Sequence, residues 1–204
     1  MIEPQDEPEV AEAARRSTGG SRLDLKRARV LIVDDNQQAL EVLAQALLGF
    51  CVRNPNQARS VEEAVRLLGH DQFDLIIVDA EMPEHDGFDL AGHIRANPGN
   101  PNFTVPIMLL SNFTPRHKVM RARDAGVNVV IAKPIVPAVL LGRIEWLARH
   151  PRPFVTSDGY CGPDRRFKTV PLPEGIPERR ADAMRLIAQP ERAMSQNEID
   201  SIFG

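Results

Sequence analysis

This chain of 204 residues has few long hydrophobic runs and lacks the sequence pattern of a secretion signal. Its apolar runs fall well short of the roughly 20 residues that a membrane-spanning helix requires, so we expect no membrane segment. The N-terminus, Met1-Ile2-Glu3-Pro4, is acidic and lacks the basic and then apolar pattern of a secretion signal. We therefore expect a cytoplasmic protein.

The chain also has few cysteines and only a small excess of charge of one sign. Only Cys51 and Cys161 are present, far apart and without metal-ligand spacing, which argues against a disulfide framework. The 25 basic and 28 acidic side chains give a net charge of -3, so nothing in the total indicates binding to nucleic acid or to a membrane surface. The hydrophobic share of 43% is enough for one folded core.

The order of apolar and polar residues divides the chain into three segments. Residues 1–27 carry few large apolar side chains, so we expect a flexible N-terminal tail. Residues 28–150 alternate short apolar runs with amphipathic stretches, as a folded domain does. Residues 151–204 form a C-terminal extension that contains many prolines and arginines, in which helices are expected at 177–188 and 196–203, and no helix-turn-helix pattern fits.

The middle segment contains five repeats of a strand followed by a helix. Periodicity predicts strands at 29–33, 51–53, 73–78, 105–110 and 127–132, and helices at 37–49, after the Ser60–Glu63 capping box, at 87–97, from Thr114 to about Gly126, and at 136–149. Short apolar strands between helices indicate a parallel sheet covered on both faces. The right-handed crossover rule then favours a doubly wound α/β fold, with the flavodoxin-like strand order 2-1-3-4-5.

Chemically active side chains follow four of these strands. Asp34 and Asp35 end the first strand, Asp79 the third, Ser111 the fourth and Lys133 the fifth. They should meet, because the carboxyl ends of parallel strands share one edge of the sheet. Clustered carboxylates repel one another, and Mg²⁺ is the cation that such an all-oxygen site suits. A carboxylate beside Mg²⁺ can form an acyl phosphate, while metal and ammonium neutralise the developing charge.

This constellation resembles the response regulator receiver (CheY-like) family, over the middle segment alone. The matching residues are Val33-Asp34-Asp35, Asp79 to Gly87, Leu109-Leu110-Ser111 and Lys133-Pro134. The resemblance implies that Asp79 is the phosphoacceptor, Ser111 the switch hydroxyl and Lys133 the phosphate-pairing lysine. It also implies a cis peptide before Pro134. The implied metal ligands are Asp34, Asp35 and Asp79, and Glu81 adds a fourth carboxylate to the expected set.

Three positions depart from the family pattern. Val130 stands where an aromatic switch residue is common, so a signal would have to travel through the loop after the fourth strand. Asn112, followed by Phe113, replaces the very small residue that usually follows the switch hydroxyl. Together with Glu81, these residues lead us to expect an altered lifetime of the acyl phosphate.

The C-terminal extension contains two further motifs. Turn chemistry is expected at Gly162-Pro163-Asp164, and the arginine pairs 165–166 and 179–180 could clasp a phosphorylated ligand such as a cyclic dinucleotide, or pair with acids of the extension itself. At the end of the chain, Ser195 and Glu198 form a capping box before Ile199, Ile202 and Phe203, which share one helical face.

The segment Ser195–Gly204 resembles the N-terminal segment of the flagellar motor switch protein that binds a phosphorylated chemotaxis regulator. It could dock on the face formed by the fourth helix, fifth strand and fifth helix of its own domain, or on another receiver or a flagellar or chemotaxis protein. A frayed terminus is the remaining alternative.

The expected function is a phosphorelay response regulator without enzymatic turnover. A sensor histidine kinase or phosphotransfer protein would supply the phosphoryl group to Asp79, and output would be protein–protein contact, in chemotaxis or motility. The alternatives are a pseudo-receiver scaffold that works without phosphorylation, and an effector that responds to cyclic dinucleotides. A Mg²⁺-carboxylate phosphohydrolase, for which Glu81 stands two residues after Asp79, is a further alternative.

Overall fold

The computed structural model describes residues 24–157, 160–164 and 194–203. The expected N-terminal tail, the arginines 165–166 and 179–180 and the expected helix 177–188 therefore lie outside, or almost wholly outside, the described residues. Among the described residues, no helix is both long and apolar enough to cross a membrane.

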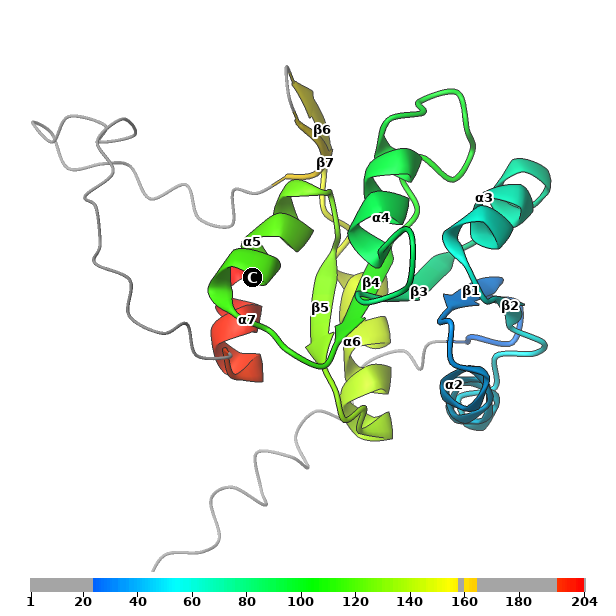
Figure 1. Cartoon of the computed structure of the whole chain (residues 1–204). Coiled ribbons are helices and arrows are strands. Elements are labelled where there is room, and N and C mark those ends of the chain that lie inside the picture. The colour runs from blue at the N-terminus through cyan, green and yellow to red at the C-terminus, as the bar shows by residue number, and fades with distance from the viewer. Residues whose placement is uncertain (1–23, 158–159, 165–193, 204) are drawn as a thin grey trace, which may run out of the picture.

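Five parallel strands form the central sheet (Figure 1). They are β1 (Val30–Val33), β2 (Asn56–Ala58), β3 (Leu75–Asp79), β4 (Ile107–Ser111) and β5 (Val129–Ala132). Their order in the sheet is β2-β1-β3-β4-β5, which confirms the predicted flavodoxin-like topology. In register, Val33 pairs with Val78, Asp79 with Leu110, and Ser111 with Ala132, so the strands end together at one edge.

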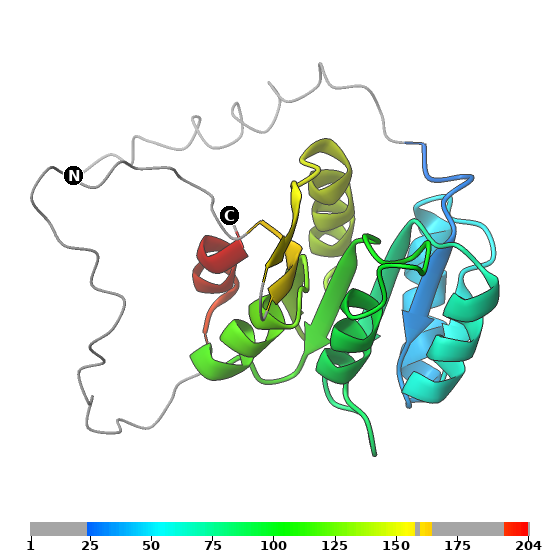
Figure 2. The same cartoon turned by 90° about the horizontal axis from the view of Figure 1, so that it is seen from above.

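Helices cover both faces of this sheet (Figure 2). The helices are α2 (Gln37–Gly49), α3 (Val61–His70), α4 (Gly87–Arg95), α5 (Arg116–Asp124), α6 (Pro137–Arg149) and α7 (Gln196–Phe203). Apolar residues of α2 and α6 pack on one face, and those of α3, α4, α5 and α7 on the other. Alternate residues of each strand serve the two cores; Leu31 and Ile32 of β1, for example, are both fully buried on opposite faces.

Side chains fix the helix starts where the sequence predicted them. Ser60 caps α3, since its hydroxyl accepts a hydrogen bond from the backbone N–H of Glu63 at 3.2 Å. The return bond of the predicted capping box is shifted by one residue, because the Glu63 carboxylate accepts from the N–H of Arg59. At α4 the box is complete, with Asp86 and Asp89 each accepting the other's backbone N–H.

The second strand is the element that the sequence misplaced. It was predicted at 51–53, but β2 runs over Asn56–Ala58. Cys51 and Asn54 adopt left-handed backbone conformations, with φ of 69° and 49°, which turn the chain after α2 and interrupt any strand. Val52 is nonetheless buried, and its N–H bonds to the carbonyl of Leu47. Its apolar character therefore reflects packing of the chain after the helix rather than a strand.

An antiparallel hairpin follows α6 and was not predicted. It consists of β6 (Phe154–Ser157) and β7 (Tyr160–Pro163), so Gly162-Pro163 lies in a strand and the predicted turn there is wrong. The pairing of Ser157 with Tyr160 leaves two residues between the strands, and the sequence there is Asp-Gly, a pair typical of tight hairpins. That signal was present in the sequence.

The hairpin packs on the five-stranded domain rather than apart from it. The Phe154 ring lies 5.0 Å from the ring of Phe103, centroid to centroid. The backbone of Gly162 approaches Gly126 so closely that an added Cβ would lie 2.8 Å from the Gly126 Cα. Part of the C-terminal extension thus belongs to the folded unit.

The C-terminal helix docks on its own domain, beside α5 and β5 (Figure 1). Its bounds agree with the prediction, as does the capping box, in which the Glu198 carboxylate accepts from the N–H of Ser195 at 2.8 Å. Ile199 and Phe203 are buried in the domain core, and Ile202 packs against it. Of the docking sites left open by the sequence, the structure shows the helix on its own α5–β5–α6 face.

Candidate functional site

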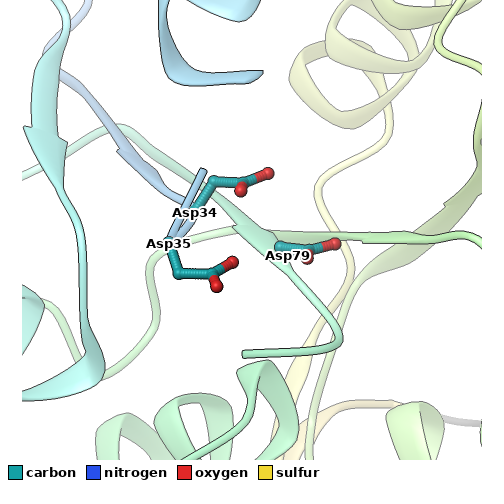
Figure 3. A group of neighbouring side chains, drawn as sticks. All are labelled: Asp34, Asp35 and Asp79. Carbon is teal, nitrogen blue, oxygen red and sulfur yellow. The ribbon is translucent and has the colours of Figure 1, made fainter. Parts of the chain in front are cut away.

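Three aspartates meet at the carboxyl edge of the sheet. Asp34 and Asp35 follow β1, and Asp79 is the last residue of the neighbouring strand β3. One carboxylate oxygen from each lies within 4.8 Å of the others, and Figure 3 shows the three carboxylates pointing to the same side. Asp34 and Asp79 are each 4% exposed, whereas Asp35 is exposed, so the cluster is reached from the side of Asp35.

Hydrogen bonds with the backbone hold Asp34 and the end of β3 at Asp79 in place. The N–H of Asp34 donates to the carbonyl of Ala58, and its Oδ1 accepts from the N–H of Asn36, the residue that caps α2. After Asp79, the N–H of Ala80 donates to Leu110 and extends the β3–β4 pairing by one step. The carboxylates therefore project from rigid strand ends.

Gly87 lets the loop after Asp79 return to the sheet. A Cβ at this position would clash with the carbonyl oxygen of Asp79, so a larger residue would displace either the start of α4 or the end of β3. The glycine is required here by close approach of the backbone.

Lys133 is the cation of the site. Its Nζ lies 2.8 Å from Oδ1 of Asp79 and 3.3 Å from Oδ2 of Asp34. Burial raises the pKa of the Asp79 carboxyl above its ordinary value, although the hydrogen bond and charge of Lys133 act in the opposite direction. For Lys133, burial acts to lower the pKa of the ammonium, but Asp79 and Asp34 outweigh it and the pKa lies above its ordinary value. The peptide between Lys133 and Pro134 is cis, as expected.

The donor set fits a hard divalent cation. Three carboxylates face one ammonium, which leaves an excess of negative charge in a largely buried place. Oδ1 of Asp79 is buried, and the described residues give it the ion pair with Lys133 but no hydrogen bond of standard geometry. An all-oxygen group of this kind suits Mg²⁺.

Glu81 is not brought into this group. Its carboxylate forms an ion pair with Nζ of Lys118 on α5 instead. The hydrogen bond from Lys118 lowers the pKa of Glu81 below its ordinary value, with a further contribution from the side chain of Asn112. The expectation that Glu81 is a fourth metal ligand is therefore not supported by the geometry. Lys118 itself was missed, because nothing in the sequence links residues 37 positions apart.

Ser111 ends β4, the strand next to Asp79, and its hydroxyl is engaged within its own loop. Oγ donates to the carbonyl of Phe113 at 2.9 Å and accepts from the Phe113 N–H at 3.3 Å. Thr114, which follows Phe113, bonds to the C-terminal segment: its hydroxyl donates to the carbonyl of Met194 at 2.9 Å. The loop after β4 thus connects the acidic edge of the sheet to the docked helix.

The positions that depart from the family pattern have distinct environments. Val130 is an aliphatic residue buried in the core, so no aromatic ring is available to rotate at this position. Phe113 is 45% exposed, and its ring lies 5.7 Å from Nζ of Lys118. Lys118 therefore contacts both Glu81 and Phe113 beside the acidic site.

The fold and the acidic edge define a receiver domain. Residues 30–145 match the family model of the response regulator receiver domain, so the chain belongs to this family, whose members act in two-component signalling.

The similar proteins include a chemotaxis protein, a motility regulator and the receiver domain of a histidine kinase. The chain is 28% identical over 120 residues to chemotaxis protein CheY-3 of Vibrio cholerae, covering 59% of this chain and 91% of that protein. It is 34% identical over 110 residues to a gliding motility regulatory protein of Myxococcus xanthus, covering 53% of this chain and only 14% of that protein. The solved receiver domain of a histidine kinase from Syntrophus aciditrophicus shows 29% identity and a TM-score of 0.54, with 64% of this chain covering 97% of it.

Proposed function

We propose that this protein is a phosphorelay response regulator in which Asp79 accepts a phosphoryl group. The observation that carries the proposal is the meeting of Asp34, Asp35, Asp79 and Lys133 at the carboxyl edge of one sheet. Such an arrangement has a nucleophile, a place for a cation and a fixed ammonium within contact distance.

The chemistry assigns a role to each residue. Mg²⁺ held by Asp34, Asp35 and Asp79 would supply positive charge to the phosphoryl oxygens. A carboxylate oxygen of Asp79 forms a bond to phosphorus while the bond between phosphorus and the histidine nitrogen of the donor protein breaks. The electron pair of the broken bond leaves with that nitrogen. Lys133, already 2.8 Å from Asp79, pairs with a phosphoryl oxygen.

Ser111 supplies the response to phosphorylation. For its hydroxyl to donate to a phosphoryl oxygen on Asp79, it must give up its bond to the carbonyl of Phe113. The exchange of one acceptor for another moves the loop after β4. A sensor histidine kinase or phosphotransfer protein is the proposed donor, and protein–protein contact in the cytoplasm is the proposed output, without catalytic turnover. The CheY-3 and gliding motility relatives favour a role in chemotaxis or motility.

Phosphoryl labelling tests this function. The full-length protein, incubated with acetyl phosphate, is expected to gain one phosphoryl group in the presence of Mg²⁺ and none when the metal is chelated, as measured by intact mass. Asp79→Asn should abolish the gain. Asp124→Asn makes the same chemical change at an exposed position of α5 and should leave labelling intact. Labelling that persists in Asp79→Asn would contradict the proposal.

A phosphorylation-independent scaffold is the second candidate. It is favoured by one observation: α7 is docked on the α5–β5–α6 face through contacts with Thr114, Val130, Ala132 and Arg143, and not through Asp79. Lack of Mg²⁺-dependent labelling, together with unchanged partner binding by Asp79→Asn, would support this candidate instead.

A further inference from the structure

The edge of the sheet at β5 is completed by a side chain of α7. An edge strand presents unpaired backbone groups that can bind another chain. Here the carboxamide of Gln196 accepts a hydrogen bond from the N–H of Ala132 at 3.0 Å and donates to the carbonyl of Val130 at 2.9 Å. A carboxamide suits this pair of backbone groups, because it carries a donor and an acceptor on two neighbouring atoms. The strand edge therefore binds the glutamine side chain through two hydrogen bonds.

Two apolar side chains of α7 fill the surface between α5 and β5. Ile199 is 0% and Phe203 2% exposed, and both belong to the core cluster that contains Val119 and Ala122 of α5 and Val130 of β5. Removing side chains of this size from water stabilises the docked helix. These two residues are the apolar anchors of the helix.

Polar contacts fix the helix at both ends and along its side. At its start, the backbone of Met194 forms two hydrogen bonds with Thr114, through the amide N–H at 2.7 Å and the carbonyl at 2.9 Å. On its side, Asp200 forms an ion pair with Arg143 of α6. At its end, Arg152 donates to the carbonyl of Phe203, one of the last carbonyls that a helix leaves unsatisfied.

The domain does not require α7 to complete its fold. The family model of the receiver domain matches residues 30–145, which end well before α7, and five strands with helices α2 to α6 already form the doubly wound sheet. An eight-residue helix is also marginal alone, so α7 depends on the surface that it covers. The helix thus depends on the α5–β5–α6 face, whereas the fold of the domain does not depend on the helix. A short helix in this relation to a domain resembles a bound peptide ligand.

We propose that the α5–β5–α6 face is a binding site for a short helix and that α7 is its tethered occupant. The site recognises glutamine in the first turn, isoleucine three residues later and phenylalanine at the end, through the strand edge and the two apolar anchors. A partner protein that uses this face must present a helix of the same chemistry and displace α7. The proposal does not depend on phosphorylation of Asp79.

A competition experiment with the full-length protein tests this. A fluorescein-labelled peptide of residues 194–203 is titrated, without Mg²⁺ or phosphodonor, into the wild type and into the double variant Ile199→Glu with Phe203→Glu. Fluorescence anisotropy is expected to show at least about tenfold tighter binding to the double variant, because a tethered helix competes at an effective concentration on the order of millimolar.

A matched pair of peptides tests the recognition of glutamine. A Gln196→Ala peptide should bind about tenfold more weakly, as expected for the loss of two hydrogen bonds. An Asn197→Ala peptide loses the adjacent amide, which is exposed, and should bind like the parent. Equal loss for both peptides would overturn the role of Gln196.

Other outcomes would overturn the tethered occupant. Equal affinity of the wild type and the double variant, or no binding to either, would mean that α7 is not an exchangeable ligand. A dimer in light scattering that is weakened by Gln196→Ala would place the helix in a second copy of the chain. Should the double variant fail to fold, full-length Gln196→Ala replaces it, and its groove should bind the parent peptide more tightly than the wild type does. Failure of phosphoryl labelling would leave all these results unaffected.

Discussion

Arg95 stands buried among uncharged acceptors. Its guanidinium donates to the carbonyls of Phe103, Val105 and Gly126 and to the side-chain oxygen of Asn128, at 2.6–3.1 Å. The side chain is 3% exposed, and burial lowers the pKa of the guanidinium to about 10. Five donors in one planar group let a single residue tie the end of α4 to the chain segments before β4 and β5.

Replacing Arg95 should therefore destabilise the domain strongly. Arg95→Met keeps the apolar stem but leaves three carbonyls without a donor, and each buried unsatisfied group costs about 1–3 kcal/mol. We expect urea denaturation to show a loss of at least about 3 kcal/mol in the free energy of unfolding. Arg66→Met, at an exposed position of α3, should change it by less than about 0.5 kcal/mol. Similar losses in both variants would contradict this account.

Asn112 and Phe113 define a second prediction at the residue scale. Both are exposed beside the acidic site. Asn112 stands where the family usually has a small residue, and its side chain also contacts the carboxylate of Glu81. We expect Asn112→Ala to open the site to water and shorten the lifetime of the acyl phosphate by about threefold, which corresponds to about 0.65 kcal/mol of barrier. Loss of label over time measures it, with Asn97→Ala, exposed after α4, as the control. An unchanged lifetime would count against a shielding role.

The acidic edge could be predicted from the sequence because its residues are tied to strand ends. Once the strands were recognised, their carboxyl ends had to bring Asp34, Asp79 and Lys133 together. Glu81 could not be placed in this way, since it lies in a loop and its direction depends on an ion pair with Lys118. Loop side chains follow tertiary partners, which a local pattern does not contain.

At the scale of elements, periodicity located most helices and strands within a few residues. The helices at 37–49 and 196–203 have the predicted bounds. The errors occurred where a short apolar stretch has more than one explanation, as with Val52, or where proline and glycine occur inside a strand, as in β7. In β7 the contact of Gly162 with Gly126 explains the glycine, and that contact is visible only in three dimensions.

The predicted start of α5 illustrates a competition between elements. Thr114 was expected to open this helix, but α5 begins after Pro115 without a side-chain cap. The hydroxyl of Thr114 donates to Met194 of the C-terminal segment instead. One threonine thus exchanges a local cap for a contact with a residue 80 positions away.

At the scale of the whole molecule, the loop after β4 connects the acidic site with α7. Ser111, the last residue of β4, bonds to Phe113 in this loop, and Thr114 of the same loop bonds to Met194. With Mg²⁺ and beryllofluoride, a mimic of the phosphoryl group, we expect amide NMR signals of Asp79 and Ser111 to shift and those of α7 to shift with them.

A variant of Thr114 separates the two parts of this response. Thr114→Val removes the hydroxyl that holds Met194 but keeps the shape of the side chain, so the shifts in α7 should diminish while those of Asp79 and Ser111 remain. Wild-type shifts confined to residues 28–150 would show that α7 does not respond to the state of Asp79.

The amide of Gln196 on β5 also bears on how this domain would behave in isolation. If the chain were cut before α7, the backbone of Val130 and Ala132 would lose its partners and the apolar surface of α5 would be uncovered. Exposed strand edges next to apolar patches promote self-association. In the whole chain, the short C-terminal helix covers this surface and so opposes self-association. A receiver prepared without the helix should therefore be less soluble than the whole chain.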